Sequence, residues 1–580
     1  MIKASTKRVN QRGFNLVVCL VTITLSTLCV SCGGSESNQK SLVNNQDNLN
    51  NGSGGSSEEI TTPALYFELK TRELGLIHEW GFVNLAEQSD ADFSVDPLIE
   101  SGFQTSGGIA IGDYNQDGRI DIFITSGNLS ASKLFQQQSD GTYLDVAKHA
   151  GVQLLGIYSG PSFADTDNDG DLDLFIGGMG HNSSKFFINQ GDGTYIEGIA
   201  PDITKEFTLS SSFGDFNSDG YLDLALSHYG SRRTQDPEIL WLNTQNNLFN
   251  SISISSGISQ TELKASYDDS ELDYTFTPSF ADLNNDGKLD FLMASDFFNS
   301  SYFINIDGEN FSNSTLNLNI KKDDLHGMGS SLADIDNDGD LDWFVTNIIL
   351  FQQESGSLKF TGNKLFQNNG NGTFTDISYQ SNIYNGGWGW ASCVADFNND
   401  GMLDIFNTNG WSMASAEEGK YESHDSDTIK LFLATDSGKF TENNIELGLK
   451  DQGQGRAVVC FDGDNDGDID ILLSNHDIDK NGLIYYENTA KLNNYLKIDL
   501  KAYGKNIFAI GARVYVKDQV REQMREVNIN SNFTSQNPSQ LHFGLGEITK
   551  VEQLRIVWPN GEIQILTDIE ANQSLLIKQQ

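Results

Sequence analysis

The sequence is poor in cysteine, proline and positive charge, and each shortage excludes a class of protein. Only five cysteines and eight prolines occur in 580 residues, which excludes a disulfide scaffold and extended polyproline linkers. Lysine and arginine number 37 against 80 aspartates and glutamates, giving a formal net charge of −43. A surface of that sign repels nucleic acid and attracts metal cations. We therefore expect no nucleic acid among the partners.

The apolar run Leu16–Val30 is too short for a membrane-spanning helix, which needs about 20 apolar residues. Four basic residues precede the run, and Cys29-Val30-Ser31-Cys32 ends it. Residues 1–31 thus resemble a bacterial lipoprotein signal peptide, with Cys32 as the lipidated first residue of the mature chain. Cys29 departs from that pattern, which normally has Leu there. An ordinary secretory signal is the alternative.

Either signal predicts export. Lipidation at Cys32 further predicts a membrane-anchored lipoprotein at the outer membrane or cell surface. Residues 32–62 consist mainly of Ser, Asn, Gly, Gln and Glu, so they cannot bury enough apolar surface to fold. We expect them to form a disordered tether between the lipid and the folded part of the chain.

A nine-residue acidic pattern, Asp-x-Asp/Asn-x-Asp-Gly-x-x-Asp, occurs seven times, with first aspartates 50 to 67 residues apart. The oxygen-bearing side chains at positions one, three, five and nine are the candidate metal ligands. They are Asp113, Asn115, Asp117 and Asp121 in loop one; Asp165, Asp167, Asp169 and Asp173 in loop two; Asp215, Asn217, Asp219 and Asp223 in loop three; Asp282, Asn284, Asp286 and Asp290 in loop four; Asp334, Asp336, Asp338 and Asp342 in loop five; Asp396, Asn398, Asp400 and Asp404 in loop six; and Asp462, Asp464, Asp466 and Asp470 in loop seven.

The chemistry of the pattern points to calcium. Ca²⁺ binds six to eight oxygens, and carboxylates at positions one, three and five converge on one point when the glycine at position six allows a sharp turn. Strands flank these loops and no glutamate stands at position twelve, so they are not EF-hands. One such loop is a weak signal, but seven with matched flanks predict about seven Ca²⁺ sites.

The flanks predict a repeated strand–loop–strand unit. An apolar residue stands two positions before each first aspartate, and an apolar strand such as Asp121-Ile-Phe-Ile follows each loop. Later hairpins also recur, giving four short strands in each unit of roughly 58 residues. Seven units over residues 63–488 predict an all-β fold, a seven-bladed β-propeller.

The repeats resemble FG-GAP (VCBS) repeats. Residues 489–580 carry Gly511-Ala512-Arg513-Val514, Leu541-His542-Phe543-Gly544-Leu545-Gly546 and Trp558-Pro559-Asn560-Gly561, which resemble an ASPIC/UnbV domain. The combination resembles cartilage acidic protein-like bacterial lipoproteins. It implies a small β-sandwich-like C-terminal domain but no particular reaction.

The propeller face opposite the acidic loops is the candidate ligand face. Aromatic rings beside Asn, His and Arg suit a sugar or peptide ligand. These residues are His228, His326, Trp388, Trp390, Asn409, Trp411, Arg456 and His476. The alternative is that the tryptophans fill the channel mouth and the histidines are solvated loop residues.

No nucleophile or acid–base pair stands apart from the acidic loops, so the pattern disfavours an enzyme. Cys460 occupies a core position and Cys393 a small-residue position in a different blade, and both are expected to be packing thiols. The leading hypothesis is a lipid-anchored binding module for a protein or glycan at the cell surface. The alternatives are an enzyme or pathway accessory that uses the opposite face, and a structural component of an envelope assembly.

Overall fold

The computed structural model describes residues 65–80, 105–127, 130–180, 182–198, 207–229, 239–245, 248–258, 273–297, 299–318, 326–349, 351–354, 357–411, 424, 426–442, 444–476, 482–490 and 493–580. The predicted signal peptide, the tether and Cys32 lie outside these residues. The described residues all belong to the compact unit Thr61–Gln580. No helix among the described residues is both long and apolar enough to span a membrane.

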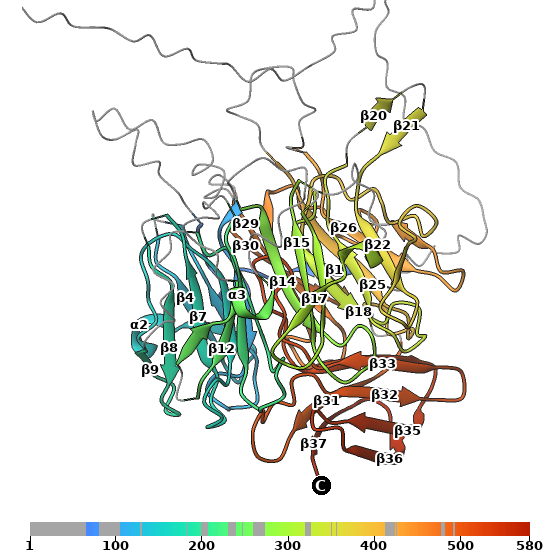
Figure 1. Cartoon of the computed structure of the whole chain (residues 1–580). Coiled ribbons are helices and arrows are strands. Elements are labelled where there is room, and N and C mark those ends of the chain that lie inside the picture. The colour runs from blue at the N-terminus through green and yellow to red at the C-terminus, as the bar shows by residue number, and fades with distance from the viewer. Residues whose placement is uncertain are drawn as a thin grey trace, which may run out of the picture. The chain divides into compact units, whose positions relative to one another are not determined.

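Seven four-stranded antiparallel sheets make up the repeat region (Figure 1). In sheets one to three the strands, from innermost to outermost, are β2 (Ile109–Gly112), β3 (Asp121–Ile124), β4 (Lys133–Gln137) and β5 (Tyr143–Asp145); β6 (Tyr158–Ala164), β7 (Asp173–Gly178), β8 (Lys185–Asn189) and β9 (Tyr195–Glu197); and β10 (Ser210–Gly214), β11 (Asp223–Ser227), β12 (Leu240–Asn243) and β13 (Phe249–Ser251).

Sheets four to seven follow the same order. Their strands are β14 (Thr275–Ala281), β15 (Asp290–Ser295), β16 (Ser301–Asn305) and β17 (Phe311–Asn313); β18 (Ser330–Ala333), β19 (Asp342–Val345), β22 (Lys364–Asn368) and β23 (Phe374–Asp376); β24 (Gly389–Ala395), β25 (Asp404–Asn409), β26 (Lys430–Ala434) and β27 (Phe440–Glu442); and β28 (Gly455–Phe461), β29 (Asp470–Asn475), β30 (Leu483–Asn488) and β1 (Phe67–Leu69).

Each acidic loop joins the first two strands of its sheet, and its ninth residue is the first residue of the second strand. In sheet one, for example, Gly112 ends β2 and Asp121 begins β3, and these two residues are register partners. Apolar residues flank the loop because both strands are buried on their two faces by neighbouring sheets. The predicted order of strand, acidic loop and strand is therefore confirmed.

The innermost strands contact one another in chain order, from β2 through β6, β10, β14, β18 and β24 to β28, and β28 contacts β2. The outermost strand of sheet seven is β1, whose Phe67 pairs with Asn488 of β30, so both ends of the repeat region share one sheet. Separate apolar clusters lie between successive sheets, such as the one joining Phe123 and Phe163. The predicted all-β class, with repeated four-stranded sheets of propeller type, is confirmed.

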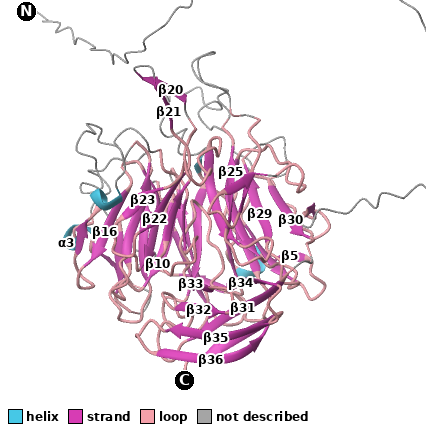
Figure 2. Ribbon diagram, turned by 90° about the vertical axis from the view of Figure 1, so that its right-hand side faces the viewer, coloured by secondary structure: helices cyan, strands magenta, loops and turns pink. Residues whose placement is uncertain are grey.

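Short elements decorate the sheets. Two one-turn helices, α2 (Ala147–Ala150) and α3 (Ser253–Ser256), follow the fourth strands of sheets one and three. A 3₁₀ turn, η2 (Thr315–Leu318), follows sheet four. A two-stranded hairpin, β20 (Phe351–Glu354) and β21 (Ser357–Phe360), is inserted between β19 and β22 (Figure 2).

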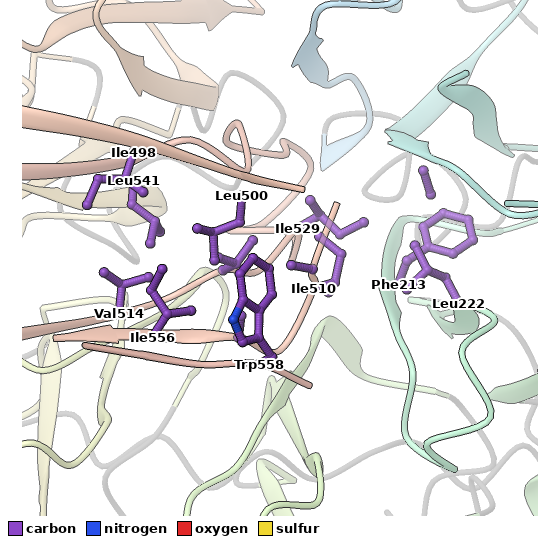
Figure 3. Packing of buried hydrophobic residues seen from close by; sticks show 14 of the residues in the cluster. Phe213, Leu222, Ile498, Leu500, Ile510, Val514, Ile529, Leu541, Ile556 and Trp558 are labelled. Carbon is purple, nitrogen blue, oxygen red and sulfur yellow. The ribbon is translucent and has the colours of Figure 1, made fainter. Parts of the chain in front are cut away.

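The C-terminal domain consists of two sheets. One has the order β34 (Leu541–Gly546), β31 (Asn494–Lys501), β37 (Gln573–Lys578), and the other β33 (Glu522–Glu526), β32 (Arg513–Lys517), β35 (Lys550–Val557), β36 (Ile563–Glu570). Apolar side chains of both sheets, including Ile498, Val514 and Trp558, form one cluster (Figure 3). The cluster continues through Ile529 to Phe213 of sheet three, so the core of this domain is shared with the repeat region.

A segment of the C-terminal domain, residues 528–538, fills the space enclosed by the innermost strands; we call it the channel segment. Its amide side chains make the backbone hydrogen bonds that a neighbouring strand would otherwise make. Gln536 accepts the N–H of Phe163 at 2.8 Å and donates to the Phe163 carbonyl at 2.7 Å. Asn530 pairs with the N–H and carbonyl of Phe280 in the same way. Because an innermost strand is an edge strand, these bonds satisfy backbone groups that would otherwise lie unpaired in the channel.

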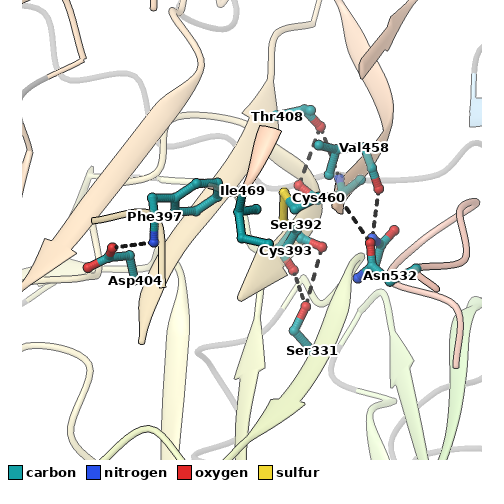
Figure 4. The surroundings of a disulfide bond; sticks show 12 residues. Ser331, Ser392, Cys393, Phe397, Asp404, Thr408, Val458, Cys460, Ile469 and Asn532 are labelled. Carbon is teal, nitrogen blue, oxygen red and sulfur yellow. Dashed lines mark hydrogen bonds between the residues drawn. A yellow bond between two sulfur atoms is a disulfide. The ribbon is translucent and has the colours of Figure 1, made fainter. Parts of the chain in front are cut away.

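Cys393 and Cys460 form a disulfide between β24 and β28, with Cα atoms 6.3 Å apart (Figure 4). The prediction that they are separate packing thiols is wrong. The reason is a one-residue offset in the repeat: Cys393 lies three residues before Asp396, whereas Cys460 lies two residues before Asp462. Successive side chains of a strand point to opposite faces, so the two cysteines face each other between sheets six and seven.

Candidate calcium loops and aromatic face

The seven acidic loops share one backbone conformation. The fourth residue has a φ between 56° and 63° and the glycine at position six a φ between 82° and 98°. In every loop the glycine N–H donates to the Oδ2 atom of the first aspartate, at 2.6 to 3.2 Å. Asparagine is frequent at position four because it tolerates the left-handed region better than most residues. The sequence therefore sets both the turn and the orientation of the first carboxylate.

Three loops bring three aspartates to within reach of one ion. The carboxylates at positions one, three and five have oxygens within 4.8 Å of one another in loops two, five and seven. These sets are Asp165, Asp167 and Asp169; Asp334, Asp336 and Asp338; and Asp462, Asp464 and Asp466. The other four loops carry asparagine at position three and keep the same hydrogen bond from position six to position one.

Several carboxylate oxygens of these loops are buried without a hydrogen-bond partner among the described residues. Asp165 is 3% exposed, and its Oδ1 atom accepts no hydrogen bond. The Oδ2 atoms of Asp121 and Asp223, at position nine of loops one and three, are in the same state, and both residues are wholly buried. An ionised oxygen buried without a partner is costly. A hard cation such as Ca²⁺ would offset that cost, so the residues fit the metal that the pattern predicts.

Burial also changes the ionisation of the loops when no cation is present. Burial, as the largest cause, and the neighbouring aspartates together raise the pKa of Asp165 to about 7 and that of Asp121 to about 8. The pKa of Asp223 is raised well above its usual value, again mainly by burial. Without a cation, these carboxyls therefore bind protons more readily than exposed aspartates do.

The aspartate at position nine also ties the loop to its sheet. In each sheet one of its oxygens accepts the N–H of the last residue of the third strand, at 2.7 to 3.0 Å. The structure thus groups positions one, three and five in loops two, five and seven, and it adds this backbone bond at position nine in every loop. A ligand role for position nine stays a prediction.

A set of amide side chains braces neighbouring sheets and was not predicted from the sequence. Each ends the third strand of one sheet and donates to the carbonyl of the second loop residue of the preceding sheet, at 2.6 to 2.9 Å. They are Gln137, Asn189, Asn243, Asn305, Asn368 and Asn488. The recurring asparagine in Phe-Ile-Asn-Gln, Phe-Ile-Asn-Ile and Phe-Gln-Asn-Asn was the available signal.

The C-terminal domain places cations against the loops. Lys497 Nζ lies 2.5 Å from Asp462 Oδ2 of loop seven. Arg513 Nη2 lies 3.9 Å from Asp282 Oδ2 of loop four and also pairs with Glu526. The partly buried Arg525 lowers the pKa of Asp334 and Asp396, partly opposing the increase caused by burial. A cavity of about 160 Å³ remains between Arg525, these loops and the channel segment.

The candidate ligand face is more buried than the sequence suggested. His228, Trp390, Asn409 and Arg456 are buried, whereas His326, Trp388, Trp411 and His476 are partly exposed. Trp390 and the channel-segment residue Phe533 have ring centroids 5.4 Å apart and belong to one apolar cluster. The buried members therefore fill the channel mouth, and the partly exposed ones form its rim.

Three tryptophans form the main aromatic group of this face. Trp388 and Trp411 are stacked with ring centroids 5.4 Å apart and planes 13° from parallel, and Trp390 lies 5.5 Å from Trp411. The guanidinium of Arg456 sits 4.2 Å from the Trp390 ring centroid and donates to the Gly410 carbonyl. Burial lowers the pKa of Arg456 to about 9, so the side chain stays cationic at neutral pH and holds the rings through cation–π contact.

Two histidine–aspartate pairs stand on the same face. His424 Nδ1 is 2.8 Å from Asp427 Oδ2, and the His424 ring meets Trp388 edge-on at 5.4 Å. His326 Nδ1 is 2.7 Å from Asp296 Oδ1, whose other oxygen accepts the Tyr229 hydroxyl at 3.2 Å. His424, Asp427 and Asp296 were not predicted from the sequence. His424 and Asp427 are only three residues apart, but no spacing in the sequence places them beside Trp388 or brings Asp296 to His326.

Comparison with known proteins agrees with this architecture. The family model described as an FG-GAP-like repeat matches residues 113–176, 165–226, 282–345 and 347–406, and the model described as ASPIC and UnbV matches residues 502–580. Both parts of the predicted resemblance are confirmed.

Cartilage acidic protein 1 of Xenopus tropicalis is 29% identical over 256 residues, covering 35% of this chain and 38% of that protein. The Mus musculus protein is 27% identical over 255 residues, with the same shares. The chain thus matches well under half the length of these relatives.

A structure of a lectin from Agrocybe aegerita that recognises non-reducing terminal N-acetylglucosamine aligns with a TM-score of 0.35 and 16% identity. It covers 58% of this chain and 79% of the lectin. A likeness at that level carries no functional argument.

Proposed function

Because the chain combines FG-GAP-like repeats with a C-terminal ASPIC and UnbV domain, we propose that it is an extracellular, calcium-binding propeller that binds a glycan or protein ligand. The ligand site is the part of the rim formed by Trp388 and Trp411, with the buried His424 edge-on to Trp388. Stacked indoles present apolar faces to a sugar ring or a peptide side chain, while the imidazole and the Asp427 carboxylate supply directional hydrogen bonds.

The observation that carries the ligand site is the stacking of two partly exposed indoles. The rings of Trp388 and Trp411 have centroids 5.4 Å apart and planes 13° from parallel, and both side chains are partly exposed. Trp390 by contrast is buried and donates to the Gly410 carbonyl at 2.9 Å. Two stacked and partly exposed rings offer an apolar surface to a sugar ring or an apolar peptide side chain.

Calcium is proposed to bind at the acidic loops, through the aspartates and asparagines at positions one, three and five. The unpartnered Asp165 Oδ1 and the three-aspartate groups support this proposal. We propose about seven ions, one for each loop. When bound, each ion supplies positive charge that offsets the burial and mutual repulsion of the loop carboxylates.

Localisation is proposed from the N-terminal sequence. The chain would be exported and lipidated at Cys32, with residues 32–62 as the tether, at the outer membrane or cell surface. Cys32→Ala should release the protein from the membrane fraction and remove the mass of the lipid. Unchanged fractionation and mass would contradict the anchor.

The test of the binding proposal is a glycan and peptide array probed with the mature protein. Trp388→Ala and Trp411→Ala should abolish the captured signal, since each removes one of the stacked rings. Tyr379→Ala is the matched control, because Tyr379 is an aromatic residue that is 70% exposed and stacks only on Tyr384 among the described rings. Equal binding by all three variants would contradict the rim as the ligand site.

A further inference from the structure

The fourth residue of an acidic loop reaches the turn of the next loop. Gln116 Nε2 of loop one donates to the Gly170 carbonyl of loop two at 3.0 Å, and Asn168 Nδ2 donates to the Gly220 carbonyl of loop three at 3.0 Å. The corresponding bonds of later loops are Asn285 to the Asp340 carboxylate at 2.5 Å, Asn337 to the Gly401 carbonyl at 3.2 Å, and Asn399 to the Gly467 carbonyl at 3.1 Å.

The acceptors of these hydrogen bonds lie in the turn of the loop, which a bound calcium ion would order. The accepting groups belong to positions six and seven, and the carbonyl of position seven is a ligand in calcium loops of this kind. The donor at position four lies between two ligand positions of its own loop. A cation that fixes one loop therefore fixes the side chain that holds the turn of the next loop.

The series of links is interrupted twice. Position four of loop three is Ser218, whose shorter side chain makes no bond to loop four within the described residues. At position four of loop seven, Asn465 Oδ1 accepts Lys497 Nζ at 3.0 Å, and no link from Asn465 to loop one is present in the described part of the chain. The links thus join loops one to three and, separately, loops four to seven.

The cations of the C-terminal domain follow the same division. Lys497, Arg513 and Arg525 act on the first aspartates of loops four to seven. No ion pair joins this domain to Asp113, Asp165 or Asp215, the first aspartates of loops one to three, in the residues that the structure describes. A fixed positive charge at a loop opposes the entry of a divalent cation.

We propose that the seven loops bind calcium as two coupled groups, loops one to three with higher affinity and loops four to seven with lower affinity. The inference rests on the proposed calcium binding and adds its order and coupling. The amide braces from the third strands cross the joint between loops three and four. They hold position two at the end of a buried strand, however, and so belong to the framework rather than to the metal-binding turn.

The test is native mass spectrometry of the full chain during a calcium titration, with Asn337→Gly and Ser218→Gly compared with wild type. Both residues have nearly the same left-handed φ, 59° and 58°, which glycine adopts without strain. Only Asn337 makes a link to the next loop, so Ser218→Gly is the matched control.

For wild type we expect species with three and with seven ions to dominate, and intermediate counts to be depleted. Asn337→Gly should increase the species with four to six ions several-fold and leave the first three ions unchanged, while Ser218→Gly should match wild type. Seven ions bound in one statistical distribution, or identical behaviour of the two variants, would overturn the coupling. No bound calcium at all would overturn the proposed function itself, so the two failures are distinguishable.

Discussion

Lys497 of the C-terminal domain forms a buried ion pair with Asp462 of loop seven. The two charged atoms are 2.5 Å apart, and the side chains are 3% and 1% exposed. Lys497 also donates to Asn465 in the same loop at 3.0 Å. One side chain thus contacts positions one and four of the loop, so docking of the C-terminal domain and calcium binding at loop seven act on the same carboxylate.

Lys497→Met should raise the calcium affinity of loop seven. Removing one positive charge from beside Asp462 favours the divalent ion, and we expect the calcium concentration for the last ion to fall by about tenfold, or about 1.4 kcal/mol. Calorimetric titration of the mature protein measures the shift. Lys501→Met is the control, because Lys501 lies exposed on the same strand. Identical titrations of the two variants would show that the pair does not oppose calcium.

Calcium should abolish the pH dependence of stability that these carboxyls cause. Without calcium the folded pKa values of Asp165 and Asp121, about 7 and about 8, lie above the unfolded value of 3.8. The folded state then binds more protons, so its stability falls as pH rises from about 4 to 8. Bound calcium keeps these carboxyls ionised in the folded state, as they already are in the unfolded state above about pH 5, so stability should no longer depend on them over the same range. Thermal melts at pH 5 and pH 8 should show stability falling with pH in EDTA and nearly level in calcium, and equal slopes in the two conditions would contradict this account.

The channel segment should stabilise the whole repeat region. Phe533 is wholly buried against Trp390 and Phe276, and Phe533→Ala should cost about 3–5 kcal/mol of unfolding free energy. Tyr503→Ala, which truncates an aromatic residue of the same domain that is 88% exposed, should change it by less than about 0.5 kcal/mol. Denaturant unfolding compares the two. A small effect of Phe533→Ala would mean that the sheets hold the channel closed unaided.

The disulfide should stabilise the contact between sheets six and seven. It closes a loop of 67 residues, and its loss through Cys393→Ala should cost about 2–4 kcal/mol. The melting temperature of the variant and the alkylation of unreduced wild type measure the effect. Free thiols at both positions in the exported wild-type protein would contradict the assignment.

The sequence predicted the acidic loops and the four-stranded sheets well, because each loop repeats a local chemical pattern between apolar strands. It did not predict features that depend on contacts between distant segments. The pairing of Cys393 with Cys460 depends on the stacking of two sheets, and the burial of Phe533 depends on a segment that returns from the C-terminal domain. Nor does a local pattern show that Arg456 is buried against tryptophan rings rather than exposed to solvent.

The acidic loops are proposed as the calcium sites of this chain. Elemental analysis of the mature protein, after equilibrium dialysis against millimolar calcium and correction for the free ion, counts the bound ions. We expect about seven calcium ions per chain, with the number reduced by one in Asp336→Ala, which removes the position-three ligand of loop five. A dialysed protein that retains no calcium would contradict it.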